Sequence, residues 1–306
     1  MKKTGMILFI LLLMLSLSTG CSNQENSITE SNNTTDNNLE QISNKASQSD
    51  ADMFTDRDYR TAYDENESIL IHLNGDSATA SSNSVKISGS TVQITEEATY
   101  IISGTLNNGI ILVDAEDTAK LQIVLNGVSI TNESSAALYI LSADKVFVTL
   151  AEGTENTLAN GGSFIAIDEN NIDAVVFSKQ DLTFNGTGNL IITSPNGNGI
   201  VGKDDLVFTG GNYTINTSSH GIEANDSVRI TGTTQITVDA GKDGIHCENN
   251  DDTSLGFIYI SAGTLNIEAE GDGISASAYM QIVDGTFSVL AGGGSENGSS
   301  QSSNTW

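Results

Sequence analysis

A repeated triplet of a polar residue, a glycine and an isoleucine constrains this chain more than any other feature. It occurs as Asn198-Gly199-Ile200, His220-Gly221-Ile222, Asp243-Gly244-Ile245 and Asp272-Gly273-Ile274. The spacings are 22, 23 and 29 residues, and the longest one contains an insertion from Cys247 to Gly256. A sequence period in this range indicates a solenoid, a propeller or an array of repeats.

The residues around each triplet keep the same register. An apolar residue opens a strand six positions after the isoleucine at Leu206, Val228 and Met280, and the insertion delays the fourth to Ile258. A Gly-containing turn and an alternating strand follow, and an earlier copy has Val176 at the isoleucine position. A rung of about 22 residues is too short for a four-stranded propeller blade. We therefore predict an all-β fold, a parallel β-helix with three short strands per rung.

Residues 56–170 repeat less strictly but have strands of similar length. Runs such as YIISGTL and LQIVLNGVSITN are interrupted by Gly, Asn or Asp, the residue types that turn corners. We interpret this region as the first, less regular rungs of the same solenoid. A separate β-sandwich is the alternative. The calcium-binding nonapeptide of another β-helix type, GGxGxDxUx, does not occur in the sequence.

The N-terminus has the pattern of an export signal. Lys2 and Lys3 precede an apolar run from Met6 to Leu15, whose ten residues are too few to span a bilayer. Small residues lead directly to Cys21, as in a bacterial lipoprotein signal. We predict a signal peptide over 1–20 and lipidation of Cys21, with ordinary secretion as the alternative.

The predicted organisation continues with a polar, disordered tether over 21–52 and the β-helix over 53–294. Residues 295–306 are predicted to be a flexible tail or the end of a truncated chain. These features predict a location on the extracellular face of the bacterial cell membrane, with the lipid as the membrane contact. We expect the protein to be a monomer.

The charge balance narrows the choice of partners. The chain has 39 Asp and Glu against 12 Lys and Arg, for a formal net charge of −27. Such a polyanion lacks the basic surface that contacts to phosphates need, which argues against nucleic-acid binding. Because only 17% of the residues are charged while 38% are hydrophobic, a core can still form. Metal ions are the first positive partners to consider.

Stacked rungs bring equivalent acidic residues into columns. One column holds Asn198, His220, Asp243 and Asp272, and another holds Asp204 and Asp226, with Asp181 and Asp205 beside it. Carboxylates about 5 Å apart repel one another unless they are protonated, paired with lysine or bridged by a cation. Calcium suits such oxygen ligands, although Asn and Asp beside glycine also serve simply to cap turns.

The insertion adds three further acids next to Asp243. They form either a calcium site on a loop or a solvated acidic loop. The predicted calcium ligands are, in full, Asp181, Asp204, Asp205, Asp226, Asp243, Glu248, Asp251, Asp252 and Asp272. His220 and His246 fall in different columns, so a transition-metal site is not expected.

Two side chains are considered for catalysis. A polysaccharide lyase needs calcium and a Lys or Arg base, and Lys203 is the best candidate base in the repeats. Its acidic neighbours Asp204 and Asp205 would raise its pKa, which favours an ion-paired structural lysine. Cys247 has no His/Asn partner pattern around it and is expected to be a small buried hydrophobe.

Several ordered motifs resemble a family of bacterial carbohydrate-binding-domain proteins. The motifs are DRDYRTAYDE (56–65), ILIHLNGDS (69–77), TYIISGTL (99–106), LQIVLNGVSITN (121–132), ADKVFVTLAEGTENTL (143–158), GKDDLVFTGG (202–211) and the Gly-Ile repeats. The resemblance runs from Asp56 to about Gly294. It implies a right-handed parallel β-helix similar to pectate lyases, bound calcium, and binding of cellulose or of acidic glycans such as polygalacturonate. Asn198 and His220 stand where that family usually has Asp, which weakens a metal ladder there.

Together these observations predict a non-catalytic, calcium-dependent lipoprotein that binds polysaccharide at the cell surface. One alternative is a calcium-dependent, pectate-like lyase. The other is a structural or adhesion β-helix without glycan specificity.

Overall fold

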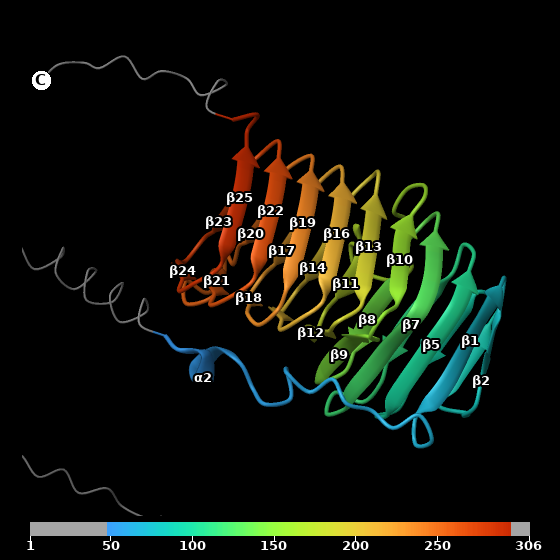
Figure 1. Ribbon diagram of the computed structural model, residues 1–306. Helices are drawn as coiled ribbons and strands as arrows, with labels where there is room; N and C mark the ends of the chain where they lie inside the picture. Colours follow the sequence, from blue (N-terminus) through green and yellow to red (C-terminus); the bar gives the residue numbers. More distant parts are fainter. Residues whose placement is uncertain (1–47, 295–306) are drawn as a thin grey trace, which may run out of the picture. The chain divides into compact units, whose positions relative to one another are not determined.

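The computed structural model describes residues 48–294, which form a stack of parallel rungs (Figure 1). Within this part of the chain no helix is long and apolar enough to cross a membrane. The expectations for the signal peptide, Cys21, the tether up to residue 47 and the tail 295–306 concern residues outside this range.

From Leu138 onward each rung has three strands, one on each of three faces. The β8 face contains β8 (Leu138–Ser142), β11 (Ala174–Ser178), β14 (Asn198–Gly202), β17 (Ile222–Ala224), β20 (Ile245–Cys247) and β23 (Ile274–Ala276). The β9 face contains β9 (Lys145–Leu150), β12 (Asp181–Gly186), β15 (Asp205–Phe208), β18 (Ser227–Ile230), β21 (Phe257–Ile260) and β24 (Met280–Ile282). The β10 face contains β10 (Glu155–Asn160), β13 (Asn189–Ser194), β16 (Asn212–Thr217), β19 (Gln235–Ala240), β22 (Thr264–Ala269) and β25 (Thr286–Ala291). Neighbours within each face pair in parallel, so the predicted parallel β-helix is confirmed.

The predicted register is also confirmed. Val176, Ile200, Ile222, Ile245 and Ile274 are Cα partners in successive strands of the β8 face. The apolar residues that open the next strand, Leu206, Val228, Ile258 and Met280, are partners on the β9 face. The inserted residues after Cys247 therefore lie outside the ladder and leave the register of the next rung unchanged, while Cys247 itself pairs with Ala224 and Ala276.

The glycine of the triplet is required by the closeness of the next rung. A Cβ on Gly199 would lie 2.5 Å from the carbonyl oxygen of Gly221 and 2.6 Å from a methyl carbon of Ile215. Gly221 meets the same obstacle one rung later, where the carbonyl oxygen of Gly244 would lie 2.6 Å away. Each glycine thus lets a corner approach its successor at the spacing that the sheet imposes.

The earlier rungs belong to the same sheets but are built differently. The parallel strands β4 (Thr91–Ile94) and β6 (Ile110–Asp114) lead into the β8 face, and β1 (Ile69–Gly75), β5 (Thr99–Leu106) and β7 (Lys120–Asn132) lead into the other two. The sandwich alternative is therefore wrong. β2 (Ala78–Ala80) and β3 (Val85–Ser88) make antiparallel pairs at the first turn.

The prediction of three strands per rung is wrong for these first rungs. β7 pairs with β9 through Lys120–Leu125 and with β10 through Ser129–Asn132, so one continuous strand serves two faces. β5 does the same, with a register shift after Ile102. Gly104 lies at this shift with φ +94°, a conformation that residues with a Cβ rarely adopt, and it lets the strand bend without ending.

Alternating side chains point inward and form one continuous core. Stacked aliphatic residues fill it, and an aromatic cluster lies near the middle, where the rings of Phe184 and Phe208 stack at 5.1 Å between centroids. Tyr213 packs edge-on against both rings, and its hydroxyl donates a hydrogen bond of 2.7 Å to the carbonyl oxygen of Gly210. Burying each such side chain stabilises the fold by about 1.5–3 kcal/mol.

An N-terminal segment, residues 48–63, lies across the outer side of the β9 face; we call it the strap (Figure 1). It includes the short helix α2 (Asp50–Met53). Gln48 exchanges hydrogen bonds with Gln281 of the last rung, and Phe54 packs against Tyr259. Residues 48–52, which the sequence assigned to the tether, are therefore part of the folded domain. The next two residues, Met53 and Phe54, bury apolar side chains on this face.

Asp58 is the polar anchor of the strap. Its side chain is buried and lies 2.9 Å from the ammonium of Lys145, while Thr183 donates a hydrogen bond of 2.6 Å to it. Its backbone carbonyl accepts a further bond of 2.6 Å from the Thr209 hydroxyl. Burial opposes ionisation, but the Thr183 hydrogen bond and the Lys145 charge outweigh it and hold the pKa of Asp58 below its ordinary value.

We predict that Asp58→Ala lowers the free energy of unfolding by about 3–5 kcal/mol at pH 7, because the largely buried Lys145 would lose its nearest carboxylate and keep only the 3.9 Å contact with Asp181. Since the folded-state pKa of Asp58 is lowered, its contribution is present above the unfolded pKa and is lost as the pH falls below about 4. Urea unfolding of the full chain at several pH values measures this. Asp56→Asn, at an exposed acid of the same segment, is the control and should change nothing; a loss under 1 kcal/mol in Asp58→Ala would contradict the anchoring role.

Candidate metal-binding sites

The aspartates of the β9 face stack as the sequence predicts. Lys145 and Asp181 are Cα partners at the start of their strands, and Asp205 and Ser227 hold the same position in the next two rungs. Asp205 is neutralised by Arg229, whose guanidinium lies 2.7 Å from its carboxylate. Lys145 lies 3.9 Å from Asp181. Burial, and then the charge of Asp205, raise the pKa of Asp181 to about 6.

Asp204 and Asp226 form a second pair in the turns that precede β15 and β18. Their carboxyl groups share a hydrogen bond, and burial together with this bond and the charge of Asp226 raises the pKa of Asp204 to about 6. Asn249 of the insertion donates a hydrogen bond of 2.9 Å to Asp226. Within residues 48–294 the observed ion pairs supply neither carboxylate with a cationic partner. When both groups are ionised, the repulsion between them therefore has no cationic compensation among the described residues.

Hydrogen bonds within the insertion itself form its turns. The Asn249 side-chain oxygen accepts hydrogen bonds from the backbone amides of Asp251 and Asp252, and Asp252 accepts two from Ser254. Asp252 thus caps a turn, as the alternative to a calcium loop supposes. Asp251 and Glu248 instead line a polar groove of about 260 Å³.

The two side chains considered for catalysis are both engaged. Lys203 lies 3.6 Å from Glu223, one rung further on, and its ammonium is 5.7 Å from the ring centre of Phe177. It is an ion-paired lysine, as predicted, but its partner is Glu223 and not the adjacent aspartates. Cys247 is buried in the core, and burial raises the pKa of its thiol to about 12, which makes it a poor nucleophile.

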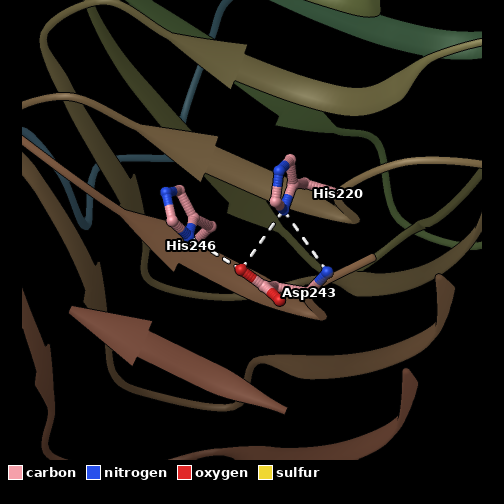
Figure 2. Close-up of side chains that lie close together, drawn as sticks. All are labelled: His220, Asp243 and His246. Atoms are coloured by element: carbon pink, nitrogen blue, oxygen red, sulfur yellow. Dashed lines mark hydrogen bonds and ion pairs between the residues drawn. The ribbon is translucent and has the colours of Figure 1, made fainter. Parts of the chain in front are cut away.

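A third cluster, His220, Asp243 and His246, was not expected from the sequence (Figure 2). One ligand atom from each residue lies within 4.8 Å of the other two. Asp243 Oδ2 is 2.8 Å from His246 Nδ1 and 3.5 Å from His220 Nδ1, and the two imidazole rings stack at 4.7 Å. The expectation that these histidines, being in different columns, do not form a transition-metal site is wrong about their placement, since both lie beside Asp243.

The cluster forms because two adjacent columns meet at a corner. His220 and Asp243 precede the glycines of successive triplets, whereas His246 lies in β20 beside Glu223 of β17. The three-residue step from Asp243 to His246 turns the corner and brings both side chains together. This spacing, combined with the one-rung offset to His220, is the sequence signal that could have identified the cluster.

Neighbouring groups hold the cluster in position. The Asn198 side-chain oxygen accepts a 2.9 Å bond from the backbone amide of His220, and the backbone amide of Asp272 donates a 2.7 Å bond to Asp243 Oδ1. Asp272 is otherwise exposed. Burial, followed by the charge of His246, lowers the pKa of His220, which favours the neutral imidazole that metals bind.

This architecture is that of a parallel β-helix with acidic and histidine side chains along its corners. The chain belongs to the family described as carbohydrate-binding domain-containing protein, whose model matches residues 88–306. A relative from Acetivibrio thermocellus with the same description is 36% identical over 211 residues, which cover 68% of this chain and 73% of the relative. The solved structure of a polysaccharide lyase-like protein from C. thermocellum, a gadolinium derivative, is similar with a TM-score of 0.66 and 31% identity. That comparison covers 72% of this chain and all of the other, and the resemblance inferred from the sequence motifs is confirmed.

We predict that Asp204→Asn stabilises the protein at pH 7 in buffer with a chelator. Because the folded-state pKa of Asp204 is raised, the folded chain holds its proton longer than the unfolded chain, and stability falls as the pH rises from about 4 to about 6. The variant should gain on the order of 1 kcal/mol at pH 7, a small value because solvent screens the pair, and almost nothing at pH 4. Thermal unfolding across this range measures the difference.

The matched control for this prediction is Asp239→Asn, which removes the same charge from an exposed position of the β10 face. It should leave the slope of stability against pH unchanged. A destabilised Asp204→Asn protein at pH 7 would show that the pair is not repulsive.

Proposed function

We propose that this protein binds polysaccharide without cleaving it, as a monomer, and that calcium held by the β9-face aspartates makes the binding possible. The observation that carries the proposal is the Asp204–Asp226 pair, two carboxyl groups on successive rungs without a cationic partner in residues 48–294, in a chain of a carbohydrate-binding family. A calcium ion would relieve the repulsion, since it takes six to eight oxygen ligands. Asp181 and Asp205, one position further along the rungs, are the nearest additional acids.

The preferred ligand follows from charge. A chain with a net charge of −27 repels an acidic glycan such as polygalacturonate unless cations bridge the two. Calcium that is bound by two aspartates keeps open positions, which uronate carboxylates and hydroxyls can fill. Neutral cellulose, whose flat surface usually meets rows of exposed aromatic rings, fits less well because Phe208, Tyr213 and Tyr259 are buried.

Binding without turnover agrees with the state of Lys203, the candidate base, and of Arg229, two of the cations in the repeats. A lyase needs a free Lys or Arg base near a metal-bound uronate, whereas Lys203 is paired with Glu223 and Arg229 with Asp205. The similarity to a polysaccharide lyase-like protein keeps lyase activity as the second candidate. Accumulation of unsaturated product, followed by ultraviolet absorbance, would favour it.

The N-terminal sequence supports export and attachment to the outer face of the membrane. The apolar run from Met6 to Leu15 and the small residues before Cys21 match a lipoprotein signal. Lipid on Cys21 would hold the glycan-binding domain at the cell surface.

We predict that a polygalacturonate affinity gel retains the full chain in calcium, releases it in EDTA and retains it again when calcium is restored. Asp204→Asn and Asp226→Asn should each weaken retention about tenfold, since each removes one charged ligand at a cost of about 1.4 kcal/mol. Asp239→Asn is the control and should be retained as the unaltered chain is.

If the polygalacturonate gel retains the protein unchanged in EDTA, the proposed role of calcium is contradicted. If neither polygalacturonate nor cellulose retains the protein in any buffer, the glycan proposal fails and a surface scaffold is the better description.

A further inference from the structure

The cluster of His220, Asp243 and His246 differs chemically from the aspartate pairs. It offers two imidazole nitrogens and one carboxylate oxygen, whereas calcium prefers oxygen ligands alone. Imidazole is a borderline ligand that suits zinc, copper, nickel and similar ions. We propose that these three residues bind a divalent transition-metal ion, with zinc as the expected occupant, at a site separate from the calcium-binding aspartates.

The geometry fits a tetrahedral ion. Zinc lies about 2.0–2.1 Å from nitrogen and oxygen ligands, which sets neighbouring ligand atoms about 3.4 Å apart. The observed separations from Asp243 Oδ2, 3.5 Å to His220 Nδ1 and 2.8 Å to His246 Nδ1, lie on either side of this value. All three ligand atoms lie within 4.8 Å of one another, so small side-chain rotations would bring them to this spacing.

The hydrogen bonds of the cluster indicate which atoms a metal ion would take over. The backbone amide of Asp243 donates a long 3.3 Å bond to His220 Nδ1, so this nitrogen carries a lone pair and no proton, and a metal ion would compete with this weak bond (Figure 2). The Asp272 amide occupies Asp243 Oδ1 and leaves Oδ2 facing the imidazoles. Between His246 Nδ1 and Asp243 Oδ2, at 2.8 Å, a proton bridges the two atoms, and a metal ion would replace it.

A second carboxylate completes the arrangement. Glu248 lies 3.5 Å from Nε2 of His246, on the ring atom that faces away from the cluster. Such carboxylate–histidine–metal chains fix the ring orientation and strengthen the ligand. Because Glu248 belongs to the insertion after β20, the extra loop of this rung supplies a group that the neighbouring rungs lack at the corresponding strand end.

The site would have two consequences for the protein. Its ligands come from two successive rungs, so the ion would link them across a corner. Three protein ligands also leave a fourth position open, and His246 and Glu248 line the polar groove described above, together with Glu223, Asn249 and Asp251.

The repeat itself offers substitutions that should fold. His220→Asn installs the residue that Asn198 provides in the same column, and His246→Ser installs the residue that Ser275 provides one rung later. We predict that the full chain, after treatment with a chelator and removal of it, binds one zinc ion per molecule in isothermal titration calorimetry. Each variant should weaken zinc binding at least about tenfold. His72→Gln, which removes the exposed histidine of β1, is the control and should bind as the unaltered chain does.

Two further measurements keep the test decisive. X-ray absorption of the zinc-loaded chain should show two imidazole ligands, which requires no variant; a shell of oxygen ligands alone would overturn the proposal. Unchanged zinc affinity in both His220→Asn and His246→Ser would overturn it as well. The outcome is separable from the calcium proposal, since Asp204→Asn should leave zinc binding intact and His220→Asn should leave calcium-dependent retention on polygalacturonate intact.

Discussion

The parallel stacking of rungs is the constraint on which the rest of this structure depends. Each strand gives its backbone hydrogen bonds to the strands one rung before and after it, so residues at equivalent positions lie about 4.8 Å apart on the same face. Stacked isoleucines such as Ile200, Ile222 and Ile245 then form one continuous buried core. At the corner formed by the triplet, the same spacing leaves no room for a Cβ atom, so glycine occupies that position. The core and the Gly-Ile triplet are therefore two results of one geometric requirement.

Stacking also brings like charges close together, and the partners that compensate this repulsion differ from one column to the next. Asp205 is paired with Arg229 from the next rung, and Lys145 lies between Asp58 of the strap and Asp181. Asp243 faces the imidazoles of His220 and His246. Asp204 and Asp226 have no cationic partner among the described residues; Asn249 donates a hydrogen bond to Asp226, and burial, followed by the interaction with Asp226, raises the pKa of Asp204. Part of the acidity of the chain is thus concentrated at definite places along the solenoid, which is where cations are expected to bind.

Features that follow from the repeat period, such as the register of the rungs, could be predicted from the sequence. Contacts between a rung and a distant segment, or between two columns, could not. The register from Val176 to Ile274 follows directly from spacing, since each rung repeats the last. The first rungs lack that period because β5 and β7 run through two faces, and only their solenoid character could be inferred. Asp58 contacts Thr183, 125 residues away, and no local pattern marks such a contact. The histidine cluster joins two adjacent columns across a corner, so the spacing within either column alone does not reveal it.

The strap changes how such a stack can come apart. In a solenoid each rung contacts its neighbours, so stability is close to a sum of local terms and unfolding can begin at an end. Here Gln48 is bonded to Gln281 of the last described rung, Asp50 to Tyr259, and Asp58 to residues of β9 and β12. One segment therefore spans several rungs, and loosening of a terminal rung is opposed by contacts made elsewhere along the strap. Because Asp58 is held by charge and by a buried threonine, the strap ties the N-terminal part of the folded domain to its C-terminal rungs, a coupling that stacking alone does not provide.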